Sequence, residues 1–345
     1  MAAVVLAGCQ ADGNGPQGSG SSRSFYLGFS GFPPRLDQDV AVQAIEAWTR
    51  RADIAIVHEE LPWTDLLAGV APDTILRREK DGLIGYYRAK GLKLVFIADP
   101  NDGLSRGEEA PRLRALGRSF TEPAVQAVYR DWVLAFVRRF HPEYVGLVAE
   151  TNLIRIAAPA PLYQAIVAAA RATAPAVKAL PSPPQLFVSV QVEVAWGKLV
   201  NQPYLGVEQD FADFPFLELL GLSSYPYFGW PDPDQIPADY YRRILNGRNL
   251  PVMVVEGGWT SEPVLNITST PAVQAKYFRR QLELLARTSA IGWLQLAPTD
   301  LDLPFFPAEL REAIRPFASL GVFDAQLRPK PALAVWDSVF ALPRR

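Results

Sequence analysis

The sequence predicts an α/β fold, a single (β/α)8 barrel, and three observations lead to this expectation. Short apolar runs rich in β-branched residues alternate with longer amphipathic segments from residue 24 onward. Runs such as LKLVFIA and PVMVVE are apolar throughout, as in parallel strands buried on both faces. The turn Gly31-Phe32-Pro33-Pro34 lacks the spaced glycines that usually follow the first strand of an open, doubly wound sheet. A closed TIM barrel is therefore favoured over the open sheet.

The apolar runs number eight, enough for one complete barrel. Each run ends in a cluster of polar, Gly or Pro residues, which marks the end of a strand. The predicted strands cover residues 25–30, 54–58, 92–98, 144–149, 186–192, 219–223, 252–255 and 291–296. Amphipathic periodicity predicts helices at residues 37–51, 72–90, 122–140, 161–174, 234–246, 270–287 and 307–318. Residues 197–216, rich in Pro, Asp and aromatic side chains, predict a long loop with at most a short helix.

Composition limits the classes of function that the chain can have. With 345 residues, 49% of them hydrophobic and 20% charged, the chain can bury a large core. A formal net charge of -2 offers no broad basic face, so nucleic acid is not an expected partner. One cysteine and two histidines leave little for a metal site, so we expect neither a metal nor a cofactor. No change in composition divides residues 24–345, and a single monomeric domain is expected.

The first residues resemble a bacterial lipobox, because Cys9 follows Leu6-Ala7-Gly8 behind a short apolar stretch. On this interpretation residues 1–8 are the remnant of a signal peptide. Residues 9–23 are then a lipidated cysteine and a flexible tether rich in Gly, Ser and Gln. The absence of Lys and Arg before Cys9 leaves a free thiol as the alternative. We expect a protein of the cell envelope, on its periplasmic or surface side, that touches the membrane only through its lipid anchor.

The C-terminal ends of the predicted strands carry carboxylates, amides and aromatic rings, and in such barrels the active site lies at these ends. Pyranose rings stack on aromatic faces while their hydroxyls bond to carboxylates and amides, which predicts a carbohydrate ligand. A phosphate site would need Arg, Lys or free backbone amides instead. The candidate substrate-binding residues are His58, Glu59, Asp99, Asn152, Gln191, Tyr225, Trp259 and Trp293.

Glu150 and Glu256 are the candidate catalytic pair. Each directly ends an apolar strand, where a charge is costly unless the side chain projects into a site. Glycosidic cleavage needs one carboxyl group to protonate the leaving oxygen and a second carboxylate to attack carbon or activate water. Two glutamates after the fourth and seventh strands would face each other across the mouth of the barrel.

This pattern resembles clan A of the retaining glycoside hydrolases, in which the acid/base glutamate follows strand four and the nucleophile follows strand seven. Glu150 in YVGLVAETN and Glu256 in PVMVVEGGW match those positions. Tyr225 in LSSYPYF is similar to the clan's tyrosine beside the nucleophile, and Trp293 in IGWLQL is similar to the tryptophan that floors the sugar subsite. The segment LGVFDAQLRPKPAL resembles the region before the last helix of these enzymes.

The resemblance implies a retaining glycosidase that acts on a β-linked poly- or oligosaccharide. Within the clan, the nearest similarity is to the endo-β-1,4-galactanase (arabinogalactanase) family. Clan members usually carry Asn directly before the acid/base, where it bonds the sugar 2-hydroxyl, but this chain has Ala149. Either Asn152 or Gln191 replaces that contact, or the preferred sugar lacks it, or activity is weakened or lost.

Two further classes of function compete with the enzyme. A weakened or inactive relative would be a surface carbohydrate-binding lipoprotein, and Ala149 is the residue that favours it. A barrel of another class, such as a metal-dependent hydrolase or an aldolase, is disfavoured because the chain lacks the histidines or a strand-end lysine.

Overall fold

The computed structural model describes residues 22–345, whose centre is a barrel of parallel strands. Neighbouring strands follow the order β5-β4-β3-β2-β1-β9-β8-β7-β6, and every pair is parallel. Their bounds are β1 Tyr26–Ser30, β2 Ile54–Glu60, β3 Lys93–Asp99, β4 Tyr144–Gly146, β5 Gln185–Phe187, β6 Ser189–Gln191, β7 Leu220–Ser224, β8 Val252–Gly257 and β9 Ala290–Gln295. The predicted fold class, an α/β TIM barrel, is confirmed.

Closure of the barrel depends on β5 and β6, which are two parts of the predicted fifth strand with Val188 between them. The first part pairs with β4 and the second with β7, so the two ends of the strand order belong to one continuous run. The predicted fourth strand is shorter than expected, ending at Gly146. The chain beyond it still pairs, because the Leu147 amide donates to the Phe187 carbonyl at 3.0 Å.

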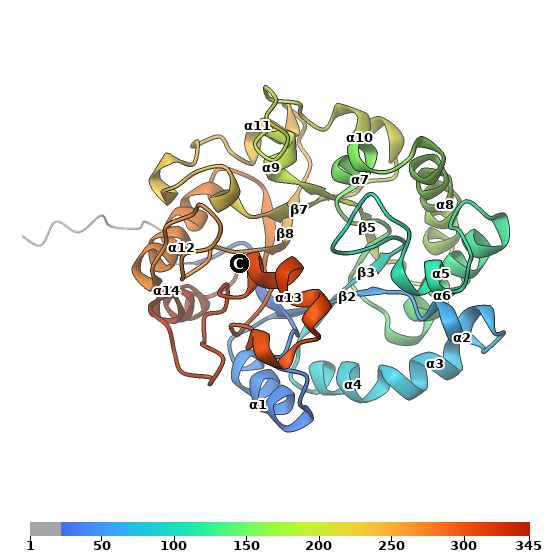
Figure 1. The fold of residues 1–345 in the computed structure, drawn as a ribbon, viewed down its shortest axis with the longest axis horizontal. Coiled ribbons are helices and arrows are strands. Elements are labelled where there is room, and N and C mark those ends of the chain that lie inside the picture. The colour runs from blue at the N-terminus through green and yellow to red at the C-terminus, as the bar shows by residue number, and fades with distance from the viewer. Residues whose placement is uncertain (1–21) are drawn as a thin grey trace, which may run out of the picture.

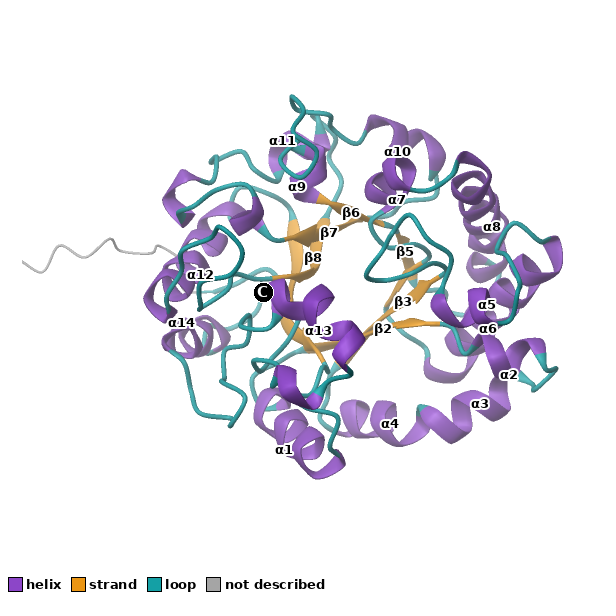
Figure 2. Ribbon diagram, viewed as in Figure 1, coloured by secondary structure: helices purple, strands orange, loops and turns teal. Residues whose placement is uncertain are grey.

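Helices surround the strands in the outer ring of Figure 1, and Figure 2 shows the same separation by secondary structure. The α-helices are α1 Gln38–Thr49, α2 Trp63–Leu67, α3 Pro72–Glu79, α4 Asp81–Ala89, α5 Pro111–Ala115, α6 Pro123–Phe140, α7 Thr151–Ala157, α8 Ala160–Lys178, α9 Val192–Ala195, α10 Glu208–Asp213, α11 Arg242–Leu245, α12 Pro271–Leu285, α13 Ala308–Ile314 and α14 Pro331–Phe340. Short 3-10 helices cover η1 Pro226–Phe228, η2 Pro233–Gln235, η3 Leu303–Phe305 and η4 Arg315–Phe317. The loop predicted at residues 197–216 contains only α10.

Three predicted helices differ from the observed ones, each at an identifiable residue. The helix expected at 72–90 is divided at Lys80, whose φ of -118° departs from helical geometry. The helix expected at 234–246 is wrong: Pro237, its fourth residue, has no amide hydrogen to donate, and only η2 and α11 form. The helix expected at 307–318 ends as α13, and Pro316 lies in the tighter turn η4 that follows.

The interior of the barrel is filled by side chains that alternate along the strands. Ten residues form this core: Ile54, Ile56, Val95, Ile97, Ala149, Phe187, Leu219, Met253, Val255 and Leu294. Two strand glycines make room for its largest ring, since a Cβ atom on Gly146 or Gly221 would lie 2.8 Å from Phe187. The opposite strand faces pack against the helices in two larger clusters.

The described part of the chain begins close to the boundary predicted for the barrel domain. Arg23 is buried, its guanidinium contacts Asp53 at 2.6 and 3.0 Å, and its amide donates to the Pro343 carbonyl at 3.0 Å. Arg23 therefore belongs to the barrel domain, one residue before the predicted boundary at 24. Cys9 lies outside the described residues. No helix within residues 22–345 has the length and hydropathy to cross a membrane.

Replacing Phe187 with Ala is expected to lower the free energy of unfolding by roughly 3–5 kcal/mol, because the interior of the barrel cannot collapse around the lost ring. Phe32, which is 46% exposed, is the matched control, and its replacement by Ala should change stability by less than about 0.5 kcal/mol. Chemical denaturation of the three proteins measures both effects. Equal losses of unfolding free energy in the two variants would contradict a stabilising role of Phe187 in the barrel interior.

Candidate active site

Glu150 reaches the mouth of the barrel through an unusual backbone conformation. Ala149 directs its methyl group into the barrel core, and Glu150 then adopts left-handed torsion angles, φ 50° and ψ 46°. A non-glycine residue there costs of order 1–3 kcal/mol, and such strain concentrates at functional sites. The Glu150 amide is held by the Ser189 hydroxyl at 2.9 Å. Two successive side chains, Ala149 and Glu150, thereby both face the interior.

Glu256 reaches the same place through a bulge in β8. Leu222 of β7 pairs with Val254, but the next residue, Ser223, pairs with Glu256, so Val255 is an extra residue. Simple alternation would send Glu256 toward the helices with Val254, and the extra residue turns it inward. Gly257 follows with φ 155°, and a Cβ atom there would lie 2.3 Å from the Ser224 carbonyl oxygen. Only glycine fits this approach of β8 to β7.

A single hydroxyl group joins the two glutamates. Ser223 Oγ lies 2.6 Å from Glu150 Oε1 and 3.0 Å from Glu256 Oε1. The sum of these distances, about 5.6 Å, is the greatest separation that the two Oε1 atoms can have. Tyr225 also donates to Glu256 Oε1, at 3.0 Å. The structure thus brings Glu150, Glu256 and Tyr225 together.

Two cations balance the carboxylates and share a third acid, Asp99. His58 Nε2 lies 2.8 Å from Asp99 Oδ2, and His58 Nδ1 lies 3.3 Å from Glu256 Oε2. Arg106 bonds Asp99 Oδ2 through Nη1 at 2.6 Å and Glu150 Oε2 through Nε at 2.7 Å. These five residues are called the charge cluster below. All but the partly exposed His58 are buried, so unpaired charges here would cost several kcal/mol each.

The two glutamates differ in the direction of their pKa shifts. Burial raises the pKa of Glu150, and the charge of Glu256 adds to this effect, although Arg106 opposes it. Burial also opposes ionisation of Glu256, but contacts with His58, Arg106 and Tyr225 lower its pKa below the usual value. One carboxyl group therefore favours its proton while the other favours its charge.

The other members of the charge cluster are held in their ionised forms. Burial disfavours the charged imidazole of His58, but Asp99 and Glu256 outweigh it and raise its pKa to about 9. Burial likewise opposes ionisation of Asp99, but Arg106 and His58 lower its pKa. With Glu150 protonated, two carboxylates face two cations. The cluster is then neutral.

Arg106 is delivered by the loop that follows β3. The Asn101 amide donates to the Arg106 carbonyl at 2.8 Å, and the Asp102 carboxylate accepts from the backbone amides of Leu104 and Ser105 at 2.9 and 3.1 Å. These bonds fold the loop over the end of β3, so that the Arg106 side chain enters the barrel mouth. The loop thus holds Arg106 in contact with both Asp99 and Glu150.

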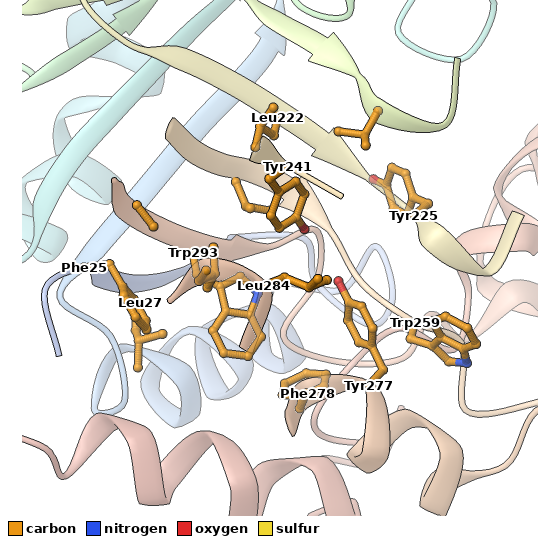
Figure 3. Close-up of a cluster of buried hydrophobic side chains, with 14 of the residues drawn as sticks. Phe25, Leu27, Leu222, Tyr225, Tyr241, Trp259, Tyr277, Phe278, Leu284 and Trp293 are labelled. Atoms are coloured by element: carbon orange, nitrogen blue, oxygen red, sulfur yellow. The ribbon is translucent and has the colours of Figure 1, made fainter. Parts of the chain in front are cut away.

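Two predicted substrate-binding tryptophans lie elsewhere. Trp293 is fully buried on the outer side of β9, in the cluster of apolar side chains drawn in Figure 3. Its ring lies 5.0 Å from that of Trp336 and 5.3 Å from that of Phe278. Trp259 is fully buried in the same cluster, and its indole donates to Ser269 at 3.1 Å. The resemblance placed Trp293 beneath a sugar, but the strand presents it to the helices. Both rings stabilise the helix layer.

Three other predicted residues make bonds within the protein. Asn152 exchanges two hydrogen bonds of 2.8 Å with the backbone of Gln191. The Gln191 side chain accepts from the Val194 amide at 2.7 Å and donates to Glu193 at 2.6 Å. Glu59, which alternates with His58 on β2, forms an ion pair with Lys80 on the outer side. Neither amide is free to replace the contact that Ala149 lacks.

Sequence reasoning missed Arg106 and Ser223. Ser223 shares the inward phase of β7 with Leu219 and Gly221, so period-two alternation extended one residue further would have found it. The same alternation places His58 and Asp99 inward after Ile56 and Ile97. Arg106 lies seven residues beyond Asp99 in a loop, and no periodic signal marks it.

A cavity of about 200 Å3 adjoins the charge cluster at His58. It lies by the ends of β1 and β2, and its lining includes Ser30, Phe32, Glu59 and Tyr87. A larger open hollow of about 560 Å3 is lined by α3, α4 and α6 residues and contains none of the predicted site residues. Within residues 22–345, no group of three or more His, Cys, Asp or Glu side chains is arranged to hold a metal ion.

Solved structures with the same fold include several carbohydrate-active proteins. An exo-β-1,4-mannosidase of Opitutaceae bacterium strain TAV5 superposes with a TM-score of 0.67 at 15% identity, over 92% of this chain and 59% of its own. Xylanase 10B of Thermotoga maritima gives 0.60 at 15% identity, over 92% and 95%. A GH5_18 protein of Bifidobacterium longum subsp. longum ATCC 55813 gives 0.65 at 15% identity, over 94% and 81%.

At such identities the similarity establishes the fold and leaves the activity open. This chain spans 59% of the length of the mannosidase. No protein-family model matches the sequence, and no curated protein is similar to it in sequence.

The raised pKa of His58, about 9, has a measurable consequence for stability. Folding raises this pKa above the usual histidine value of 6.5, so the stabilisation is complete below pH 6.5 and is lost as pH rises through about 9. We expect unmodified protein to exceed His58→Gln in stability by about 3 kcal/mol near pH 6 and by much less near pH 10. Chemical denaturation at the two pH values measures the difference.

An NMR titration checks the same assignment directly. The chain has only two histidines, His58 and His141, and the His58→Gln variant identifies the His58 signal. A midpoint for His58 near 6.5 would contradict its place between two carboxylates.

Proposed function

We propose that the protein is a retaining glycoside hydrolase that cleaves a β-linked poly- or oligosaccharide. The observation that carries this proposal is the pair Glu150 and Glu256. One hydroxyl group bridges the two carboxyl groups, and their pKa values are shifted in opposite directions. Retaining enzymes place their two carboxyl groups about 5–5.5 Å apart, and inverting enzymes about 6.5–9.5 Å apart. The upper limit of about 5.6 Å between the Oε1 atoms favours retention.

In the first half-reaction, the ionised Glu256 attacks the anomeric carbon and forms an ester to the sugar. The bond from that carbon to the leaving oxygen breaks, and Glu150 gives its proton to the oxygen. In the second half-reaction, Glu150 takes a proton from water, the water oxygen bonds to the anomeric carbon, and Glu256 departs as a carboxylate.

The charge cluster stays neutral through both half-reactions. Before attack, Glu256 and Asp99 carry the two negative charges that face His58 and Arg106. In the covalent intermediate, Glu256 is an uncharged ester and Glu150 is ionised, so two negative charges again face two cations. This constancy lowers the cost of moving charge within a buried site.

 The exo-β-1,4-mannosidase is named for a β-1,4-linked mannoside and xylanase 10B for xylan, and a GH5_18 structure from Bifidobacterium longum holds Manβ1-4GlcNAc. We therefore propose β-linked mannosides and xylosides as the first substrates to test, together with the galactan that the sequence resemblance indicates.

A second candidate function is carbohydrate binding without turnover, and Ala149 is the observation that favours it. Its methyl group is packed in the barrel core, and the amides of Asn152 and Gln191 are bonded within the protein. The amide that clan members offer to the sugar 2-hydroxyl thus has no substitute among these residues. Such a contact contributes several kcal/mol in the transition state.

Glu256→Gln is expected to reduce the release of reducing sugar at least about 10³-fold, because the amide cannot form the sugar ester. Glu150→Gln should be impaired most strongly on substrates with poor leaving groups, since activated aryl glycosides need little protonation. The measurement is hydrolysis of β-linked mannans, xylans, galactans, glucans and their aryl glycosides by the domain from residue 22 onward. Proton NMR of the first product identifies its anomer.

Glu283→Gln, an exposed glutamate on α12, is the control and should retain full activity. An inverted first product would exclude the double displacement. Binding of a glycan without hydrolysis in the unmodified protein would favour the second candidate function.

Tyr225→Phe removes the phenol that donates to Glu256 at 3.0 Å. A hydrogen bond to the ionised form lowers the pKa of a carboxyl group. Its loss is therefore expected to raise the apparent pKa of the acidic limb of the pH–rate profile. The rate constant kcat should fall by about 10- to 100-fold, as for the loss of a bond to a charged group. An unchanged acidic limb would contradict the role of Tyr225 beside the nucleophile.

A further inference from the structure

Ser223 contacts both carboxyl groups of the proposed catalytic pair, yet it has only one proton to donate. Its Oγ lies 2.6 Å from Glu150 Oε1 and 3.0 Å from Glu256 Oε1, and the residue is fully buried. A hydroxyl group donates one hydrogen bond and accepts others. At any moment, therefore, only one of the two short contacts is a bond donated by Ser223.

The neighbouring groups decide which arrangement each protonation state requires. Arg106 donates to Glu150 Oε2, so a proton on Glu150 is best placed on Oε1, facing Ser223. His58 lies beside Glu256 Oε2, and Tyr225 donates to Glu256 Oε1. When Glu150 holds its proton, Glu150 donates to Ser223 and Ser223 donates to the ionised Glu256.

The direction must reverse when the charges exchange. Once Glu150 has lost its proton and Glu256 is uncharged, the stronger acceptor is Glu150, because ionised acceptors form the stronger hydrogen bonds. The Ser223 hydroxyl then turns by rotation about its Cβ–Oγ bond and donates to Glu150. No atom other than this hydrogen has to move.

The geometry points to Ser223 as a positioning residue whose hydroxyl reverses its hydrogen bond between the two half-reactions, holding the proton on Glu150 in the first and stabilising the ionised Glu150 in the second. The sequence of two half-reactions rests on the proposed function. The hydrogen-bonded chain in the free protein does not, because it depends only on the contacts of the two carboxyl groups.

The strand supplies a matched control in the next residue. Ser224 points to the opposite side of β7, where its Oγ lies 3.0 Å from the Tyr241 hydroxyl and 3.3 Å from the Tyr240 hydroxyl. It is as buried as Ser223 and belongs to the same strand end, but it contacts neither Glu150 nor Glu256. Removing its hydroxyl tests what a merely structural role of this strand end would change.

The test is a carbon-13 NMR titration of the glutamate side-chain carboxyl groups in the whole chain. Glu150→Gln and Glu256→Gln identify the two signals. In Ser223→Ala, the pKa of Glu256 should rise because it loses a donor, and the pKa of Glu150 should fall because its acid form loses an acceptor. The separation of the two apparent pKa values should shrink by about one pH unit or more.

Two further variants distinguish the loss of the Ser223 hydrogen bonds from a general disturbance of the strand end. Ser223→Cys keeps the shape of the side chain but donates only weakly, so the separation should also shrink. Ser224→Ala should leave the separation unchanged. Either Ser223 variant suffices if the other does not fold.

A folded Ser223 variant with the separation of the unmodified protein would overturn the inference, as would an equal loss in Ser224→Ala. The pH–rate profile of the same variants separates this inference from the proposed function. If the two apparent pKa values move closer together in the Ser223 variants but the unmodified protein hydrolyses no substrate, the result supports the role of Ser223 and contradicts the proposed enzymatic function. A bell-shaped profile of unchanged width in Ser223→Ala supports the enzyme and contradicts the bridge.

Discussion

The balance of charge at the mouth of the barrel is the constraint on which the rest of the site depends. Asp99 accepts from both His58 and Arg106, and each of these cations reaches on to a different glutamate. Buried ions are stable only when they are paired and hydrogen-bonded. Two cations can balance two carboxylates, and the pKa of the third carboxyl group, Glu150, is raised in favour of its protonated form. The opposite pKa shifts of two chemically identical side chains are consistent with this count.

Two departures from regular backbone geometry place the side chains of Glu150 and Glu256 at the mouth of the barrel, beside the two cations. The left-handed conformation at Glu150 and the extra residue Val255 in β8 each break the alternation of the strands. Without them, one position in each strand end would face the barrel core and the next would face the helices. The strain at Glu150 is offset by surrounding contacts, among them the Ser189 hydroxyl on its amide and Arg106 on its carboxyl group.

Much of the barrel and part of the site could be predicted from sequence. The eight apolar runs coincide with the strand positions, because parallel strands buried on both faces must be apolar along their whole length. The ends of these runs contain Glu150, Glu256, His58, Asp99 and Tyr225, which the structure brings together. Trp293 and Trp259 lie at strand ends too, but they pack in the helix layer. A position at a strand end predicts that a residue lies near the mouth of the barrel, but it does not predict whether the side chain points inward or toward the helices.

Local hydrophobicity and the cost of a charge at the end of an apolar strand were enough to predict the closed parallel barrel and to indicate Glu150 and Glu256 as the candidate pair. The tertiary structure alone decided which contacts those glutamates make. Arg106 comes from a loop and Ser223 from a strand 73 residues beyond Glu150, and no local pattern relates them. The hydrogen bonds and charge pairs that shift the pKa values of the two glutamates in opposite directions act over a few ångströms in space, between residues that are far apart in the chain.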